Sequence, residues 1–331
     1  MNGAIVAANV DAIERAARLL ASGSLVAFPT ETVYGLGADA RNDGAVREIF
    51  AAKGRPPDHP VIVHIPGRPH LARWTREVSK QAAALAEAFW PGPLTLILPR
   101  AQGVLDSVTG GQDSVGLRVP SHPVARALLD AFGDGIAAPS ANRFGHVSPT
   151  TAAHVAADLG SAPAMILDGG ACEVGIESTI VAFRGDAALL LRPGAIGIAE
   201  LTHVLGRPPQ LPDGAAPRAS GSLAAHYSPR TPASLLQVDA LRAELAHLLE
   251  RDERVAVLAR TMARPDDFDG VWIAGRRDAV DYARELYANL RSLDTADADA
   301  ILIEAPPDDA AWLAVRDRLT RATRGEDDDR D

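Results

Sequence analysis

Basic residues with anion-binding chemistry close one predicted helix. Residues 53–60 hold Lys53, Arg55 and His59 together with three prolines, which stiffen the loop and keep the three side chains in one region. An arginine offers a planar fork that matches a phosphate or a carboxylate, and a lysine offers a point charge. The stretch therefore favours an anion site. The alternative is that these cations only stabilise the helix, because positive charge at a helix C-terminus interacts favourably with the macrodipole.

Small polar groups follow two predicted strands. Residues 29–34, Pro-Thr-Glu-Thr-Val-Tyr, follow a strand predicted at 25–28, and Ser140 and Asn142 follow one predicted at 135–139. In α/β proteins, ligands bind at strand ends. Ser140 lacks the G-x-S-x-G pattern of a hydrolase nucleophile. These hydroxyl and amide groups suit hydrogen bonds to phosphate or adenine, although the same residue types are common in turns.

Two arginines end predicted strands, Arg118 in the strand at 115–119 and Arg192 in the strand at 188–192. Arginines in buried strands are rare unless they are paired, so each needs a structural carboxylate or a ligand anion. Together with the loops above, they describe a pocket at a sheet end with cations, hydroxyls and no evident strong nucleophile. Such a pocket suits nucleotide chemistry that works by positioning and electrostatics.

Several other kinds of site are excluded by residue spacing. Only two of the 33 basic residues are lysines, and neither stands in the Gly-Lys-Ser/Thr context of a Walker A loop. The G-x-G-x-x-A pattern at 35–40 neither follows its strand directly nor opens a helix, which argues against dinucleotide binding. His59 and His64 have no third ligand nearby, which argues against zinc, and we expect His64 to be a hydrogen-bonded core histidine. The single cysteine, Cys172, excludes a disulfide framework.

The composition indicates a soluble protein of roughly two domains. The chain has 331 residues, and a domain takes about 150. A formal net charge of −10 opposes bulk binding of nucleic acid. No apolar run approaches the roughly 18–20 residues that span a bilayer, and the N-terminus lacks a signal-peptide pattern. We therefore expect a cytoplasmic protein without a membrane partner.

Residues 1–206 are predicted to form one α/β domain. Several predicted strands follow one another without intervening helices, which indicates an open, mixed sheet. The predicted helices lie at 11–22 (capped by Asp11), 42–52, 78–89, 123–132, 150–159 and 197–205, and the predicted strands at 25–28, 61–65, 94–98, 115–119, 135–139, 164–167, 178–183 and 188–192.

The rest of the chain is predicted to hold a linker, a smaller domain and a tail. Residues 207–232 contain six prolines and read as an extended linker that folds back as a lid. Residues 233–323 alternate helical and strand patterns, which favours a small parallel, Rossmann-like sheet. Residues 324–331 are an acidic run that we expect to be disordered.

The motifs as a set resemble the YrdC-type L-threonylcarbamoyladenylate synthases in their two-domain form. The matching pieces are dispersed in family order, and the linker stretch 220–229 resembles the family's linker motif. They lie at residues 28–37, 53–55, 60–65, 90–95, 117–120, 140–142, 177–180 and 191–194.

The resemblance implies an open, twisted α/β catalytic domain with a concave cavity, and a specific reaction. The family makes threonylcarbamoyl-AMP and pyrophosphate from L-threonine, bicarbonate or CO2, and ATP. Mg²⁺ accompanies ATP, and no organic cofactor is implied. The product passes to the transferase machinery that modifies tRNA to threonylcarbamoyladenosine, so tRNA itself is at most a transient contact.

The resemblance also assigns residues to each substrate, and it assigns no metal ligand. Lys53 and Arg55 are implied as catalytic, and Asn142 as orienting the loop that it shares with Ser140. On the threonine side the implied residues are Thr32, His64, Arg118, Ala138 and Ser178. On the nucleotide side they are Lys53, Arg55, His59, Ser114, Ser140, Asn142, Ser148, Arg192, His226 and Tyr227.

Two alternative functions share this fold. A carbamoyl-adenylate maturation factor would be a much longer chain with zinc-finger and acylphosphatase-like segments, and the single cysteine disfavours it. A non-catalytic RNA-binding module is opposed by the net charge of −10 and by the complete set of pocket residues.

Overall fold

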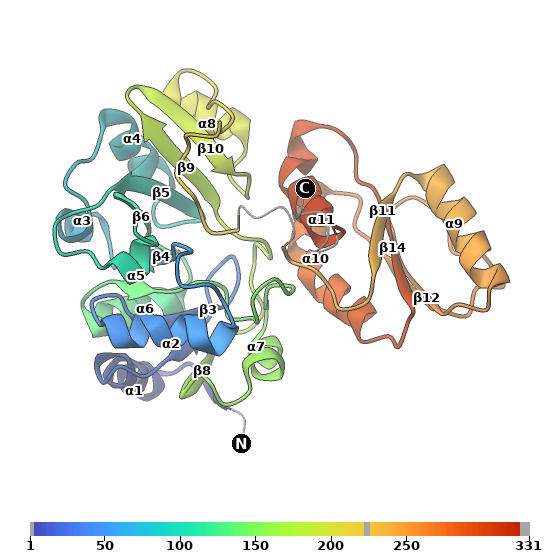
Figure 1. Ribbon diagram of the computed structural model, residues 1–331, viewed down its shortest axis with the longest axis horizontal. Helices are drawn as coiled ribbons and strands as arrows, with labels where there is room; N and C mark the ends of the chain where they lie inside the picture. Colours follow the sequence, from blue (N-terminus) through green and yellow to red (C-terminus); the bar gives the residue numbers. More distant parts are fainter. Residues whose placement is uncertain (1–2, 222–225, 325–331) are drawn as a thin grey trace. The chain divides into compact units, whose positions relative to one another are not determined.

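The chain folds into two compact units. The computed structural model describes residues 3–221 and 226–324. Among them, 3–144 and 148–221 form a larger unit, and 145–147 and 226–324 form a smaller one (Figure 1). The predicted linker at 207–232 is therefore divided between the two units. The acidic tail predicted at 324–331 lies, apart from Arg324, outside the described residues.

A ten-stranded mixed sheet forms the centre of the larger unit and confirms the predicted fold class. The strand order is β1-β8-β2-β3-β7-β4-β6-β5-β9-β10. The pairs β4–β6 and β5–β9 are parallel, whereas β5–β6 and β9–β10 are antiparallel. The strands are β1 (Ala4–Ala7), β2 (Val26–Phe28), β3 (Gly35–Asp39), β4 (Ile62–His64), β5 (Leu94–Pro99), β6 (Ser114–Arg118), β7 (Ile136–Ala137), β8 (Met165–Asp168), β9 (Thr179–Arg184) and β10 (Ala187–Arg192).

The helices of the larger unit begin and end at clear sequence signals. The helix predicted at 42–52 is α2, which Asn42 caps by accepting a hydrogen bond from the Ala45 amide and which Gly54 ends in the left-handed conformation. The helices are α1 (Val10–Ala21), α2 (Asp43–Lys53), α3 (Leu71–Trp74), α4 (Lys80–Phe89), α5 (Asp106–Thr109), α6 (Pro123–Phe132), α7 (Ala152–Leu159) and α8 (Ile198–Leu205), with a 3₁₀ turn η1 (Arg68–His70).

The cap predicted for the first helix is wrong by two residues. Asn9, in an extended conformation, accepts the hydrogen bond from the Ala12 amide at 2.9 Å. Asp11 lies in the first turn instead, where a negative charge complements the helix dipole. Helix α1 packs against α6, and together they bury a core with the side chains of β2.

Strand β3 explains the glycine pattern at 35–40, which the sequence did not predict as a strand. It pairs with β2 and β7, so the pattern is not a nucleotide loop. A Cβ atom at Gly37 would lie 2.8 Å from Phe28 Cε1 and 2.9 Å from Ile136 Cγ2. The glycine is therefore required by close packing under two large side chains.

The smaller unit is built on a parallel sheet of order β11-β14-β12-β13, as predicted. Leucines of α9 pack on β12 around Phe268. Among the described residues of the chain, no helix combines the length and apolarity needed to cross a membrane. The elements are β11 (Ala233–Leu236), α9 (Val238–Glu250), β12 (Val255–Ala259), β13 (Val271–Ala274), α10 (Ala279–Asp294), β14 (Ala300–Glu304), η2 (Ala310–Trp312) and α11 (Leu313–Ala322).

We predict that Gly37→Ala destabilises the protein by about 1–3 kcal/mol, because its methyl group overpacks the core against Phe28 and Ile136. Urea unfolding measures the loss. Gly214→Ala is the matched control, since a Cβ there meets no atom within 4 Å. Equal unfolding midpoints for Gly37→Ala and the wild type would contradict the packing argument.

Candidate active site

Strand register brings the predicted threonine-side residues onto one face of the sheet. His64 of β4 and Arg118 of β6 are direct partners in the parallel ladder. Residues directly across a ladder share a face, because side chains alternate with a period of two. Next to Arg118 on β5 stands Thr95, whose hydroxyl lies 2.8 Å from that of Ser178, just before β9. Three strands and the residue just before a fourth thus contribute to one row of polar groups.

Arg118 is paired with a carboxylate of the protein itself. Its Nη2 lies 2.7 Å from Oε1 of Glu31, and both side chains are about 95% buried, with exposures of 4% and 5%. Its Nη1 donates to the Thr32 hydroxyl at 2.8 Å, and its Nε donates to the Gly92 carbonyl at 3.3 Å. The sequence left open whether Arg118 pairs with a carboxylate of the protein or with a ligand anion, and its partner is the protein's own Glu31.

Glu31 remains ionised in this environment. Burial acts to raise the pKa of Glu31, but the charge and hydrogen bond of Arg118 outweigh burial and hold that pKa below its usual range. The Ser121 amide also donates to Oε2 of Glu31 at 3.1 Å. Sequence reasoning placed Glu31 in a polar rim without giving it a role. Its position between Thr30 and Thr32 was the available signal.

His64 is a core histidine, but the expectation that it is hydrogen-bonded is wrong. It is buried beside Phe28, with ring centroids 6.1 Å apart. Neither ring nitrogen has a hydrogen-bond partner among the described residues. Burial and the charge of Arg118 hold the pKa of His64 well below its usual range, so the imidazole is neutral. A neutral ring carries one donor and one acceptor, and both are available to a ligand.

Arg192 connects the threonine side to the predicted linker. It donates to the Ser178 carbonyl at 3.0 Å and to the Ser178 hydroxyl at 3.1 Å. Its Nη1 also donates to the carbonyl of Ser220 at 2.8 Å. A Cβ atom at Gly194 would lie 2.4 Å from the Thr179 amide, so only glycine lets this turn approach the strand.

Lys53 holds a loop rather than a carboxylate. Its buried Nζ donates to the carbonyls of Ser140 at 2.6 Å and Asn142 at 2.5 Å. Burial, and next the charge of Arg55, holds the pKa of Lys53 well below its usual range. The Ala141 amide donates to the Tyr34 carbonyl at 2.8 Å, so the same loop is tied to the end of the 29–34 segment.

Arg55 lies between two aromatic rings and the linker. Its guanidinium carbon is 5.9 Å from the Phe50 ring centroid and 5.8 Å from that of Phe144. Its Nη2 donates to the Pro60 carbonyl at 2.7 Å and lies 3.4 Å from the Ser220 hydroxyl. Ser220 is thus shared by Arg55 and Arg192.

The remaining nucleotide-side residues surround this group at different depths. His59 is half-buried with its ring 5.5 Å from Phe144, and burial, followed by the charge of Arg55, lowers the pKa of His59. Buried Ser148 donates to Glu177 at 2.6 Å. Ser114 opens β6 and lines a small pocket with Ser220. On the threonine side, buried Ala138 donates its amide to the Ile62 carbonyl at 2.9 Å.

The first part of the linker is fixed across the sheet face of the larger unit. Ala216 and Ala219 pack on an apolar cluster from β4, β5, β9 and β10. The Gln112 side chain accepts from the Arg218 amide at 2.7 Å and donates to the Arg218 carbonyl at 3.1 Å. Two hydrogen bonds from one amide therefore set the position of the residues just before Ser220.

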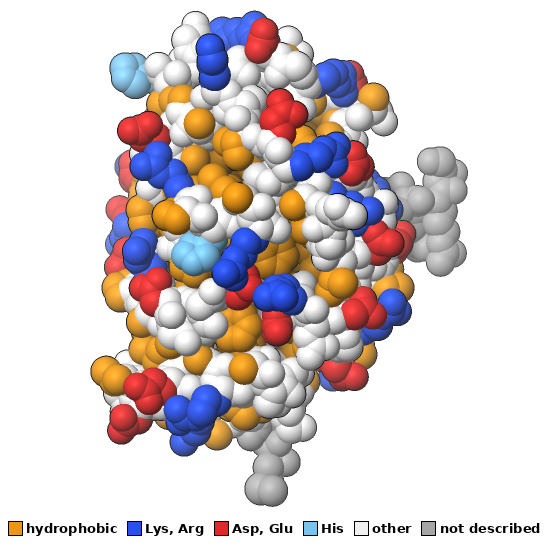
Figure 2. All heavy atoms as spheres, turned by 90° about the vertical axis from the view of Figure 1, so that its left-hand side faces the viewer, with side chains coloured by type: hydrophobic (Ala, Val, Ile, Leu, Met, Phe, Trp, Pro, Cys, Tyr) orange, Lys and Arg blue, Asp and Glu red, His pale blue; other side chains and the backbone are white. Residues whose placement is uncertain are grey.

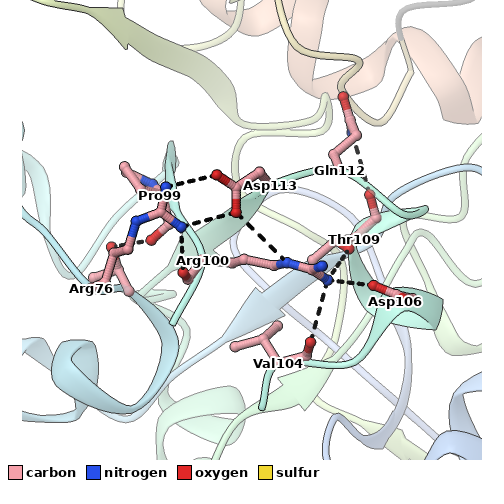
Figure 3. Close-up of polar contacts among 9 residues, drawn as sticks. Arg76, Pro99, Arg100, Val104, Asp106, Thr109, Gln112 and Asp113 are labelled. Atoms are coloured by element: carbon pink, nitrogen blue, oxygen red, sulfur yellow. Dashed lines mark hydrogen bonds and ion pairs between the residues drawn. The ribbon is translucent and has the colours of Figure 1, made fainter. Parts of the chain in front are cut away.

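The loop that carries Gln112 is itself held by charges. Figure 3 shows Arg76 and Arg100 approaching Asp113, and Arg100 reaching Asp106 on α5. Arg76 pairs with Asp113 through both terminal nitrogens, at 2.9 and 2.7 Å. The predicted site did not include this loop, because the loop positions the linker through Gln112 and belongs to none of the sequence motifs.

His226 and Tyr227, predicted to approach the nucleotide, belong to the smaller unit. The Tyr227 ring lies 5.7 Å from that of Tyr287 and 5.4 Å from the guanidinium carbon of Arg318. The His226 amide donates to the Arg321 carbonyl at 3.2 Å. These contacts anchor the segment within its own unit, and the predicted contact with ATP stays a prediction.

Neither a basic surface on the face shown in Figure 2 nor a metal-ligand cluster among the described residues adds to this site. The face in Figure 2 mixes basic and acidic side chains among apolar ones, without a continuous basic patch. Within residues 3–221 and 226–324, no group of three or more His, Cys, Asp and Glu side chains is arranged to hold a metal ion.

Comparison with known proteins places the chain in a family. Residues 18–194 match the Sua5/YciO/YrdC family model, described as telomere recombination, and residues 196–323 match the model described as threonylcarbamoyl-AMP synthase, C-terminal domain. The chain therefore belongs to the Sua5/YciO/YrdC family, in the form that carries this C-terminal domain.

Full-length relatives support the same placement. The chain is 41% identical over 325 residues to the threonylcarbamoyl-AMP synthase of Bacillus subtilis, covering 95% of this chain and 93% of that protein. It resembles the crystal structure of Pyrococcus abyssi Sua5 in complex with L-threonine, with a TM-score of 0.90, 35% identity and 97% coverage of both chains. A P. abyssi Sua5 variant with an adjacent His and Tyr changed to Ala matches with a TM-score of 0.88, at 35% identity and with 98% and 96% coverage.

We predict that Glu31→Gln destabilises the protein by about 3–5 kcal/mol at pH 7, because it leaves the buried Arg118 without a counter-charge. The folded pKa of Glu31 is depressed. Its contribution is therefore complete above the unfolded pKa of about 4.3 and is lost as the pH falls through the folded pKa. Urea unfolding at pH 7, 5 and 4 measures both effects.

The control for this experiment is Glu14→Gln, which breaks an exposed pair with Arg18 and should cost far less. Two results would rule out the assigned role of the buried pair. One is a difference in unfolding free energy between Glu31→Gln and the wild type that stays constant on acidification. The other is an equal loss of unfolding free energy in Glu31→Gln and Glu14→Gln.

Proposed function

We propose that this chain is a threonylcarbamoyl-AMP synthase, which joins L-threonine, bicarbonate or CO2, and ATP and releases pyrophosphate. The observation that carries the proposal is a pair of contact groups on strands of one sheet, Arg118 with Thr32, and Arg192 with Ser178 and Ser220, which also lies near Arg55. The first group holds residues assigned to threonine by the resemblance, and the second holds residues assigned to the nucleotide, which supports one site for both substrates. The match to a Sua5 structure that holds L-threonine supports the same assignment.

The proposed reaction has two steps. The threonine amine attacks CO2 and loses a proton, which gives a carbamate. A carbamate oxygen then attacks the α-phosphate of ATP in line, and the bond to pyrophosphate breaks. Negative charge is redistributed over phosphate oxygens, so fixed cations help more than a base does. When bound together with ATP, Mg²⁺ would supply positive charge to the phosphates and to the leaving pyrophosphate.

On the threonine side, we assign recognition to Thr32, His64, Arg118, Ala138 and Ser178. Burial and the Glu31 ion pair hold Arg118 in one orientation before substrate arrives. The neutral His64 offers a donor and an acceptor without a protein partner in the described part of the chain. These features suit a small polar amino acid that must be desolvated when it binds.

On the nucleotide side, we assign direct phosphate contact to Arg55 and Arg192. Both guanidinium groups share the polar atoms of Ser220, which ATP phosphates can replace. Lys53 acts by holding the Ser140–Asn142 loop through its two carbonyl contacts. His59, Ser114, Ser140, Asn142 and Ser148 complete the nucleotide side, with His226 and Tyr227 from the second part of the linker by resemblance.

We further propose that residues 207–232 act as a lid over this site. A carbamate and a mixed anhydride both hydrolyse, so the reaction gains from a segment that excludes water. Ser220 reaches both arginines, and Ala219 packs on the apolar cluster beside them. The product then serves a cytoplasmic transferase that modifies tRNA, with tRNA contacting this chain at most transiently.

The first test of the function is amino-acid choice. A site that hydrogen-bonds the threonine hydroxyl leaves buried polar groups unpaired when it holds 2-aminobutyrate or valine. We expect kcat/KM for product formation to fall at least about tenfold for both analogues. Product is measured by chromatography with ATP and bicarbonate present. Equal formation of adduct from valine would overturn the threonine assignment.

The second test concerns the nucleotide side. Arg192→Ala removes charge-assisted hydrogen bonds of roughly 1.5–3 kcal/mol, so turnover should fall about 10- to 100-fold with a raised KM for ATP. Arg184→Ala, in the same hairpin, removes an exposed arginine paired with Asp213 and is the matched control. Unchanged ATP kinetics in Arg192→Ala, or equal losses in both variants, would reject the assignment.

A further inference from the structure

In the smaller sheet, a side chain of the protein occupies the edge at which open parallel sheets generally bind ligands. In open parallel sheets, ligands bind at the carboxyl ends of neighbouring strands whose connections diverge. Here Glu304, the buried last residue of β14, lies at that edge beside the loop after β12. Its Oε2 accepts from the amides of Arg260, Thr261 and Met262 at 2.7, 2.7 and 3.0 Å. An internal carboxylate thus occupies the position where an anionic ligand would bind.

The opposite edge carries a pocket of about 500 Å³. It lies at the amino ends of the strands, since Val255 opens β12 and Val271 opens β13, and both line it. Phe268 gives the pocket a buried aromatic wall. Leu249 and Val271, which line the pocket, are 39% and 40% exposed, so apolar surface is accessible there.

The loops around this pocket are strongly acidic. Residues 249–254, 266–270 and 296–299 contain eight acidic and two basic residues, a net charge of −6. Both basic residues are already paired, Arg251 with Glu253 at 3.0 Å and Arg254 with Asp297 and Asp299. Asp252 and Asp269 line the pocket, and in the part of the chain that the structure describes neither carboxylate has an ion-pair partner.

We propose that this acidic edge docks a basic segment of a partner protein, one that presents arginine or lysine next to an aliphatic side chain. The aliphatic side chain fills the pocket between Phe268 and Val271, and the cations meet Asp252 and Asp269. A net charge of −6 attracts such a segment and repels nucleic acid. The proposal gives the smaller unit a role in protein recognition that is separate from the site in the larger unit.

The test uses a fluorescein-labelled decapeptide of alternating arginine and leucine as the probe. Fluorescence anisotropy measures its affinity for the full chain at 150 mM salt. Asp252→Asn with Asp269→Asn should weaken binding about tenfold, since two charges that face the peptide are lost. Asn also tolerates the positive φ of 58° at position 252, so the fold is kept. Synthase activity should stay unchanged.

The matched control removes two exposed charges elsewhere, through Glu48→Gln with Asp130→Asn in the larger unit, and should change the affinity less than about twofold. Val271→Thr, which keeps the shape of the side chain, should weaken binding about threefold by making the pocket polar. Wild-type binding weaker than about 1 mM, equal losses in the two double variants, or no effect of Val271→Thr would overturn the proposal.

Discussion

The buried ion pair between Arg118 and Glu31 is the interaction on which the rest of the candidate site depends. Two charges that are removed from water cost free energy, and this cost is offset only when each charge finds its partner. Arg118 does so by reaching three segments, Glu31 and Thr32 after β2, Gly92 before β5, and its own strand β6. One guanidinium therefore fixes the relative positions of loops that are far apart in sequence, and the neutral His64 lies beside it.

The nucleotide side follows the same rule with a different arrangement. Lys53, Arg55 and Arg192 are buried, and their cationic groups contact carbonyls, hydroxyls and aromatic rings. These contacts orient the three cationic groups before a substrate binds. Preorganised cations of this kind stabilise charge that develops on phosphate oxygens, because little rearrangement is needed when the reaction occurs.

Local signals predicted most of the framework. The helices predicted at 42–52 and 123–132 are found as α2 and α6, bounded in the structure by Asn42 with Gly54 and by Pro123 with Gly133. Strand β3 was missed because its glycines have low strand propensity, and only their packing under Phe28 and Ile136 makes them necessary. The sequence motifs also predicted which residues gather in the site, but not which of them contact one another. Glu31 and Arg118 are 87 positions apart in the chain, and no local pattern reports a pairing over that separation.

A double-mutant cycle on the pair tests the central claim most directly. Glu31→Gln, Arg118→Gln and the double variant are compared with the wild type by urea unfolding and by calorimetric titration with L-threonine. The account predicts strong coupling between the two residues. The loss of unfolding free energy in the double variant should be smaller than the sum of the two single losses by at least about 2 kcal/mol. Threonine affinity should fall in all three variants. Additive losses within about 0.5 kcal/mol, or threonine affinity equal to that of the wild type, would contradict the account.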